Sequence, residues 1–178
     1  MSSLKRYFAA FAVLLIGAVT LTGCSGYNFY KDWSEAGATI EKDHIFEAIS
    51  LDEAKSKIDS DETFVLVLGT SEASSAKNSI TVLQQQADYF EFDKKLYFIN
   101  ATSYLSKISD RKTLQETLGI TDSSKISSNI VVVCYNRGEI VLDTSKKTDD
   151  ASLENFVSSG SINYQALASY LFNDFIYN

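Results

Sequence analysis

Apolar and polar residues follow one another along the chain in blocks that predict a succession of strands and helices. Strands are predicted at the short, strand-like stretch 45–49 and where apolar residues run without interruption, at 64–68, 96–99 and 130–135. The runs at 64–68 and 130–135 are typical of strands covered on both faces of a sheet. Residues 136–138 form a turn after the last run and predict a hairpin, with 139–143 as its second strand.

Helices are predicted where apolar residues recur every three or four positions. The longest such series is Ala76, Ile80, Leu83, Ala87 and Phe90. Leu114 and Leu118 predict a shorter helix that ends at Gly119, a natural C-cap. Ser50 and Glu53 have the spacing of a capping box, which would open a helix that extends to about residue 59.

The resulting order of elements is β-α-β-α-β-α-β-β-α, in which the last helix begins at Asn163. Its apolar face comprises Tyr164, Leu167, Ala168, Leu171 and Phe175. Such alternation predicts an α/β fold, in which helices flank a mixed sheet of four to five strands. Residues 144–160 are polar, and we expect them to be irregular.

The amino-terminal segment has the pattern of an export signal. Lys5 and Arg6 precede an uncharged stretch at 8–19. This stretch suits the apolar region of a signal peptide and is short for a membrane span.

The four residues that follow, LTGC at 21–24, resemble the lipobox of bacterial lipoproteins. In that motif the cysteine is lipidated and becomes the first residue after cleavage, so the resemblance implies a signal peptide at 1–23 and lipid attachment at Cys24. An ordinary cleavage site or an uncleaved short anchor is the alternative.

Lipidation would place the protein on the extracytoplasmic face of a bacterial cell membrane. Two or more acyl chains of the palmitate type anchor a protein stably in a membrane. Cleavage removes Lys5 and Arg6 and changes the net charge from −7 to −9. Anionic lipid repels such a domain as a whole. The membrane is therefore a partner through the lipid on Cys24.

Residues 24–43 are predicted to be the lipidated terminus and a loosely ordered tether ahead of a domain at 44–178. Fully extended, about 20 residues reach roughly 70 Å. The aromatic residues of this segment are Tyr27, Phe29, Tyr30 and Trp33. As alternatives, these side chains lie at the lipid interface or dock onto the domain.

Composition excludes several classes of function. The chain has 16 Lys and Arg against 23 Asp and Glu without a basic cluster, which excludes nucleic acid as a partner. One histidine and two cysteines cannot form the usual four-ligand zinc site, and we expect no cofactor. With Cys24 acylated, Cys134 has no partner for an intramolecular disulfide.

The strand at 64–68 runs through Gly69 into a polar loop and then into the longest helix. At this junction stand Ala73, Ser74, Ser75, Ala76 and Lys77. The arrangement resembles the thioredoxin family over about 45–178, because thioredoxin-like proteins carry Cys-x-x-Cys-Lys at this place. The stretches at 118–120 and 136–139 match as well. The nearest group is the small exported thioredoxin-like proteins called bacteriocin transport accessory proteins.

The chain differs from the family at the residues that carry out thiol–disulfide exchange. In the family a helix amino terminus lowers the pKa of the first thiol, whereas here Ala73 and Ala76 occupy both cysteine positions. Neither alanine can form the mixed disulfide that thiol exchange requires, nor could a serine if the register were shifted by one residue. We therefore expect no redox enzyme. The family's cis-proline is also absent; Asn129 or Ile130 takes its place, and we expect a trans bond there.

The resemblance implies a groove beside the motif that holds an extended peptide, here at Ser71, Glu72, Asn129 and Ile130. The serines near the start of the helix have an ordinary role as N-caps and an alternative role in a small polar site.

Two further residues are candidates for chemistry. Cys134 lies inside an apolar run and is expected to be buried and inert; the alternative is a reactive thiol that meets a redox partner. His44 is expected to be a solvated surface histidine. The favoured function is a binding, adaptor or accessory module for an exported polypeptide or for envelope machinery. A structural or immunity-type surface lipoprotein is the alternative.

Overall fold

Five strands form one mixed sheet in the order β1-β3-β2-β4-β5. The computed structural model describes residues 27–175, so the predicted signal peptide and Cys24 lie outside the described residues. The strands are β1 (Phe46–Ala48), β2 (Phe64–Gly69), β3 (Leu96–Asn100), β4 (Val131–Asn136) and β5 (Glu139–Asp143). The first three in the sheet are parallel, and β4 and β5 are antiparallel to their neighbours. The predicted α/β class and mixed sheet are confirmed.

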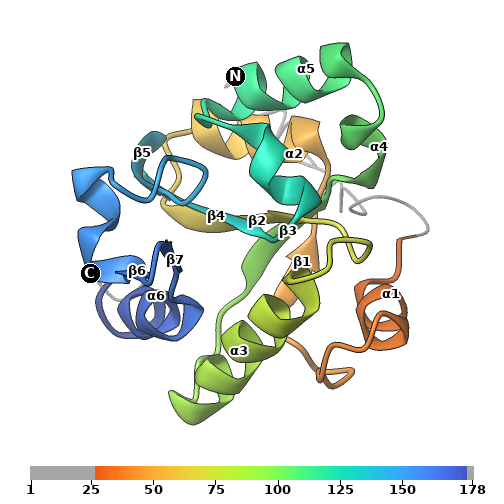
Figure 1. Cartoon of the computed structure of the whole chain (residues 1–178), viewed down its shortest axis with the longest axis vertical. Coiled ribbons are helices and arrows are strands. Elements are labelled where there is room, and N and C mark those ends of the chain that lie inside the picture. Colours follow the sequence, from red (N-terminus) through yellow and green to blue (C-terminus); the bar gives the residue numbers. More distant parts are fainter. Residues whose placement is uncertain (1–26, 176–178) are drawn as a thin grey trace, which may run out of the picture.

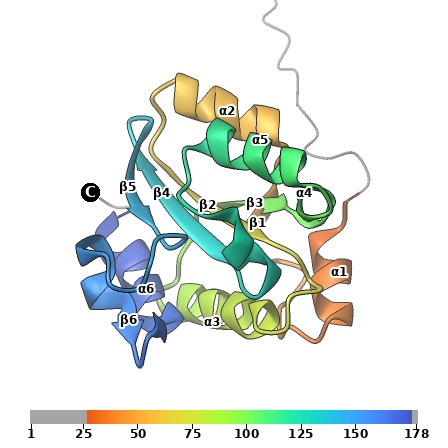
Figure 2. The same cartoon turned by 45° about the horizontal axis from the view of Figure 1, so that its top comes forward.

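Helices cover both faces of this sheet (Figures 1 and 2). They are α1 (Phe29–Glu35), α2 (Leu51–Asp59), α3 (Ala76–Tyr89), α4 (Thr102–Leu105), α5 (Ile108–Leu118) and α6 (Tyr164–Tyr170), which continues as a π-helical turn, η3 (Leu171–Phe175). Within the described residues, none of these helices has the length and apolar character needed to cross a bilayer.

The central strand β2 explains why the sheet needs two helical layers. All six of its residues are buried, and alternate side chains point to opposite faces. Val65 and Val67 join the core under α1, α3 and α6, whereas Leu66 and Leu68 join the core under α2 and α5.

The helix-capping motifs predicted from the sequence are present in the structure. Ser50 and Glu53 form the capping box of α2, in which the Ser50 N–H donates to Glu53 Oε2 at 2.6 Å. Gly119 ends α5 in the left-handed conformation, with φ of 67°, which a glycine adopts without steric cost.

The expectation of an irregular segment at 144–160 is only partly correct. The segment contains two short elements, a 3-10 helix η2 (Ala151–Phe156) and the strand β6 (Val157–Ser158), which pairs with β7 (Ser161–Ile162). Leu153 and Phe156 are buried, because they complete the core beside α6.

The expectation of a loosely ordered tether is wrong for the described residues from 27 to 43. Asn28 caps α1 by accepting a hydrogen bond from the Lys31 N–H, and the helix packs on the sheet. Trp33 is fully buried, and its indole meets the ring of Phe98 edge to face at 5.8 Å. Phe29 meets the same ring at 4.8 Å. The docking alternative therefore holds, and α1 belongs to the domain core.

Removal of the Trp33 ring tests this docking. Trp33→Ala should lower the free energy of unfolding by about 3–5 kcal/mol, because truncating a buried aromatic residue leaves a cavity. Trp33→Phe should cost less, and Lys31→Ala on the exposed side of α1 should cost almost nothing. Urea unfolding followed by circular dichroism measures all three. Equal stability of Trp33→Ala and wild type would show that α1 does not contribute to the core.

Candidate functional site

The predicted motif lies where β2 meets α3, at the carboxyl ends of the parallel strands β2 and β3. Ala73 and Ala76 are 3% and 0% exposed, and the Ala76 N–H donates to the Ala73 carbonyl at 3.1 Å. Ser74, Ser75 and Lys77 are exposed. The two methyl groups are therefore turned inward, and the polar residues of the motif lie on the surface.

The structure brings the segment before β4 against this motif. The Ser75 N–H donates to the Ser128 carbonyl at 3.2 Å, and Asn129 and Ile130 follow directly. The described residues contain no cis peptide bond, as expected here. We call the combined surface, formed by 70–77 and 128–130, the motif corner.

Several polar groups at the motif corner already have partners within the protein. Ser71 Oγ donates to Asp32 Oδ1 on α1 at 2.8 Å. The Ile130 N–H donates to Asn129 Oδ1 at 2.8 Å, and its carbonyl accepts from the Tyr164 hydroxyl at 2.6 Å. An extended peptide bound here would have to displace these contacts.

The Tyr164 contact is a neutral hydrogen bond, because burial raises the pKa of this hydroxyl. Ordinary N-capping by a serine is not formed: Ser75 is the N-cap residue of α3, but its side chain makes no capping hydrogen bond. Glu72 is exposed and stands at the rim of the motif corner.

Cys134 lies in β4, which is paired on one side with β2 and on the other with β5. Its side chain is 0% exposed, and burial raises the pKa of the thiol. A thiol that is both inaccessible and protonated is a poor nucleophile. The expectation of a buried cysteine is confirmed, and the alternative of a reactive thiol lacks the exposure that it needs.

The expectation of a solvated His44 is only partly correct, because the residue is half-buried. The imidazole packs against Phe29, with ring centroids 4.8 Å apart, and burial is the main reason why its pKa is lowered. The Nδ1 atom is buried without a hydrogen-bond partner. Among the described residues, no group of three or more His, Cys, Asp or Glu side chains could hold a metal ion.

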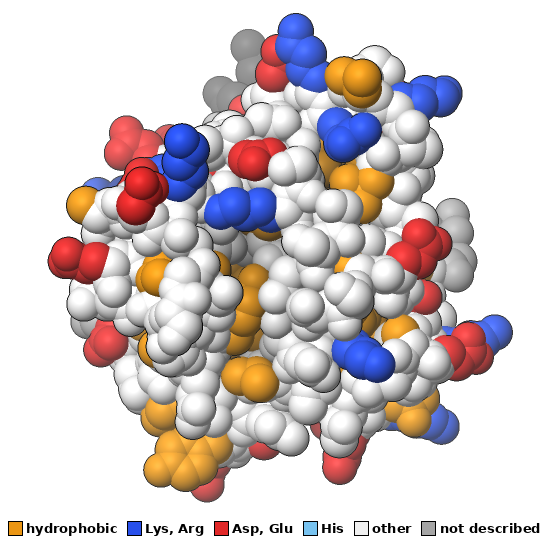
Figure 3. Space-filling view, in the orientation of Figure 1, with side chains coloured by type: hydrophobic (Ala, Val, Ile, Leu, Met, Phe, Trp, Pro, Cys, Tyr) orange, Lys and Arg blue, Asp and Glu red, His pale blue; other side chains and the backbone are white. Residues whose placement is uncertain are grey.

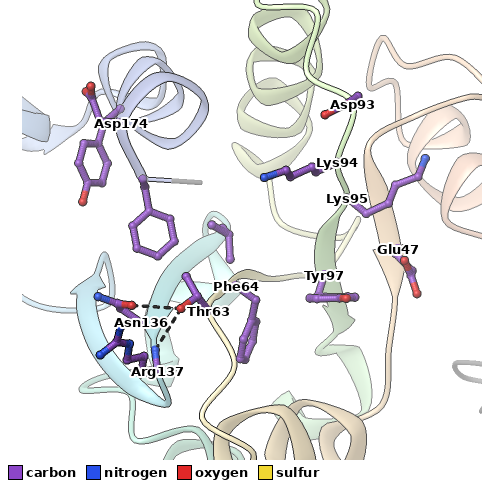
Figure 4. Close-up of a pocket in the computed structure, with 13 residues that line it drawn as sticks. Glu47, Thr63, Phe64, Asp93, Lys94, Lys95, Tyr97, Asn136, Arg137 and Asp174 are labelled. Atoms are coloured by element: carbon purple, nitrogen blue, oxygen red, sulfur yellow. Dashed lines mark hydrogen bonds between the residues drawn. The ribbon is translucent and has the colours of Figure 1, made fainter. Parts of the chain in front are cut away.

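The opposite end of the sheet carries a feature that the sequence analysis missed. A cleft of about 900 Å³ lies where β2 and β3 begin (Figure 4). Its apolar wall is formed by Phe64, Val65, Tyr97, Tyr170 and Phe175. These residues come from β2, β3 and the α6–η3 segment, so no local sequence pattern predicts that they lie together.

The cleft is charged but electrically balanced. Its basic residues are Lys94, Lys95 and Arg137, and its acidic residues are Glu47, Asp93 and Asp174. Lys94 extends into the open space, and Asp174 lies on the wall across from it (Figure 4). Such a lining suits a ligand with an apolar part and charges of both signs.

The turn between β4 and β5 holds one side of the cleft rigidly. Thr63 Oγ1 donates to Asn136 Oδ1 at 3.0 Å and accepts from the Arg137 N–H at 3.2 Å. Arg137 has a φ of 51° and Gly138 a φ of 75°, as a two-residue hairpin turn of type I′ requires.

The face shown in Figure 3 has no extended surface of one charge. Acidic and basic side chains are scattered around it, and hydrophobic side chains line a hollow near its centre.

The geometry defines an α/β domain whose β2–α3 junction lacks thiols and which has a cleft at the far end of the sheet. Comparison of the sequence with models of protein families gives no match, and no curated protein matches it. The functional argument therefore depends on the fold and these two regions.

The inaccessibility of Cys134 predicts its reactivity. A bulky maleimide should label no more than a trace of the native protein at pH 7 or pH 9, because the thiol is covered and its raised pKa keeps it protonated. Labelling should become complete in denaturant. Mass spectrometry of the mature chain measures both states, and rapid labelling of the folded protein would contradict the burial of Cys134.

Proposed function

We propose that the protein is a redox-inactive thioredoxin-like lipoprotein that binds another polypeptide at the extracytoplasmic face of a membrane. In this role it acts as an adaptor or accessory for an exported polypeptide or for envelope machinery. The observation that carries the proposal is the pair of buried alanines, Ala73 and Ala76, at the β2–α3 junction.

The fold supports the thioredoxin-like part of the proposal. The mixed five-stranded sheet, with helices on both faces, is compatible with that fold. The junction also has a suitable local geometry, since the hydrogen bond from Ala76 to Ala73 closes a turn directly before α3. The two cysteine thiols of the family's motif are missing, and thiol exchange needs both a thiolate and a second thiol.

The cleft supports the binding part of the proposal. Pockets that hold ligands combine apolar walls with a few polar groups, and the cleft has both. The motif corner is less suitable, because Ser71 and Ile130 already have hydrogen-bond partners. We therefore propose that the cleft, rather than the motif corner, receives the partner polypeptide.

The redox part is tested by restoring the missing thiols. The wild-type mature domain should not reduce insulin above the rate of the blank. Ala73→Cys combined with Ala76→Cys should form an intramolecular disulfide when treated with oxidised glutathione, because the two positions flank one turn. Ala73→Cys alone is the matched control and should form no internal disulfide.

Thiol titration and intact mass distinguish these products. Turnover of insulin by the wild type would refute the redox-inactive assignment. Failure of the folded double variant to form the internal disulfide would speak against thioredoxin-like geometry at the junction.

The binding part is tested by site-specific crosslinking in the producing cells. A photoreactive residue at Arg137, in the cleft, should give one discrete crosslinked polypeptide, whereas the same residue at Ser74, in the motif corner, should not. Both positions are exposed, so the comparison is matched for accessibility. A product from Ser74 alone would move the binding site to the motif corner, and no product from either position would refute the adaptor role.

A further inference from the structure

The docking of α1 leaves little chain between the domain and the proposed anchor. Tyr27 stacks on Phe98, with ring centroids 6.1 Å apart, and its hydroxyl donates to Asp32 Oδ2 at 2.9 Å. The same hydroxyl accepts from Trp33 Nε1 at 3.1 Å. Tyr27 is thus fixed to the core. Only three peptide units join it to Cys24, and their maximum reach is about 11 Å.

So short a connection determines which side of the domain meets the membrane. The α1 helix is bonded to the motif corner through Asp32 and Ser71. The loop of the motif corner is bonded in turn to the start of α4, since Thr70 Oγ1 and Thr102 Oγ1 lie 2.8 Å apart. Helix α1, the motif corner and the start of α4 are therefore neighbours near the edge of the sheet where β2 and β3 end.

This edge also carries the most exposed of the large hydrophobic side chains described. Ile108, the first residue of α5, is 81% exposed. Lys107 precedes it, and the half-buried Arg111 and the exposed Lys112 lie one helical turn further along α5. We call these four residues the α4–α5 patch. In both views, α1 and α4 lie on the same side of the molecule (Figures 1 and 2).

Acidic residues are also present near the patch. Asp110 lies within the same helical turn, and Lys112 pairs with Glu116 at 3.5 Å. The patch is nevertheless locally basic in a chain whose net charge is −7. The combination of an exposed apolar side chain with flanking Lys and Arg is typical of surfaces that lie at a lipid interface.

We infer that the α4–α5 patch lies against the bilayer that holds the lipidated Cys24, with Ile108 at the level of the lipid headgroups. This inference rests on the proposed lipidation. The lipid brings the domain to the surface against the general repulsion of its acidic residues, and the basic side chains of the patch offset part of that repulsion.

The same orientation turns the cleft away from the membrane. Helix α3 begins at the motif corner with Ala76 and ends at Tyr89, so its 14 residues extend about 20 Å from the membrane-proximal edge. Tyr89 is 76% exposed and therefore offers a matched reference position that the inference places far from the lipid.

Fluorescence quenching by lipid-borne nitroxide tests the orientation. Ile108→Cys and Tyr89→Cys are each labelled with an NBD maleimide in the full-length lipidated protein, which is reconstituted into phosphatidylethanolamine and phosphatidylglycerol vesicles. The label at 108 should be quenched at least about twofold more than the label at 89. Insertion of a Gly-Ser segment of about 20 residues between Gly26 and Tyr27 should reduce this difference, since the domain then gains a reach of roughly 70 Å.

The outcomes separate the inference from the proposal on which it rests. If the wild type does not float with the vesicles, or floats no better than Cys24→Ala, the lipid anchor and the orientation are both refuted. If the protein floats but position 108 is quenched no more than position 89, the orientation alone is refuted. If the insertion leaves the quenching at 108 unchanged, the short connection is not what holds the patch at the membrane.

Discussion

The arrangement of the motif corner depends on the absence of a side chain at Gly69. A Cβ atom there would lie 3.0 Å from Ile130 Cγ2 and 3.4 Å from the rings of Phe98 and Trp33. Because Gly69 has no side chain, the end of β2 lies close to the start of β4, the middle of β3 and the indole of α1. Since protein interiors have little free volume, an added Cβ would force the Ile130 side chain to give way, whereas it would meet the two rings at ordinary contact distance. The close approach of the loop before β4 to the end of β2 thus depends on this glycine.

The elements that could be predicted from the sequence are those whose signals are local. The apolar run of β2, the capping box at Ser50 and the left-handed C-cap at Gly119 each act within a few residues, and each lies where the pattern placed it. Helix α1 could not be predicted in this way. Its seven residues are mostly polar, and it is stable because Trp33 fits over the space left by Gly69, which lies far from it in the sequence.

The motif corner and the cleft also differ in how much of each could be predicted from the sequence. The motif corner could be located because a strand, a loop and a helix follow one another in the sequence. The hydrogen bonds that occupy it could not, because Asp32 and Tyr164 come from distant segments. The cleft was not predicted at all, since its walls combine residues such as Glu47, Tyr97 and Asp174, which become neighbours only when the sheet is assembled. Chemistry carried by a motif is visible in a sequence, whereas a shape formed between elements is not.

Helix α6 and the turn that continues it contact both the motif corner and the cleft. Its first residue, Tyr164, bonds the Ile130 carbonyl at the motif corner, and the turn that continues it contributes Phe175 to the wall of the cleft. Leu167 and Leu171 are fully buried between these ends, so the segment is packed into the core along its length. The motif corner and the cleft are therefore joined through one continuous segment, and a substitution that displaces this segment would disturb both regions.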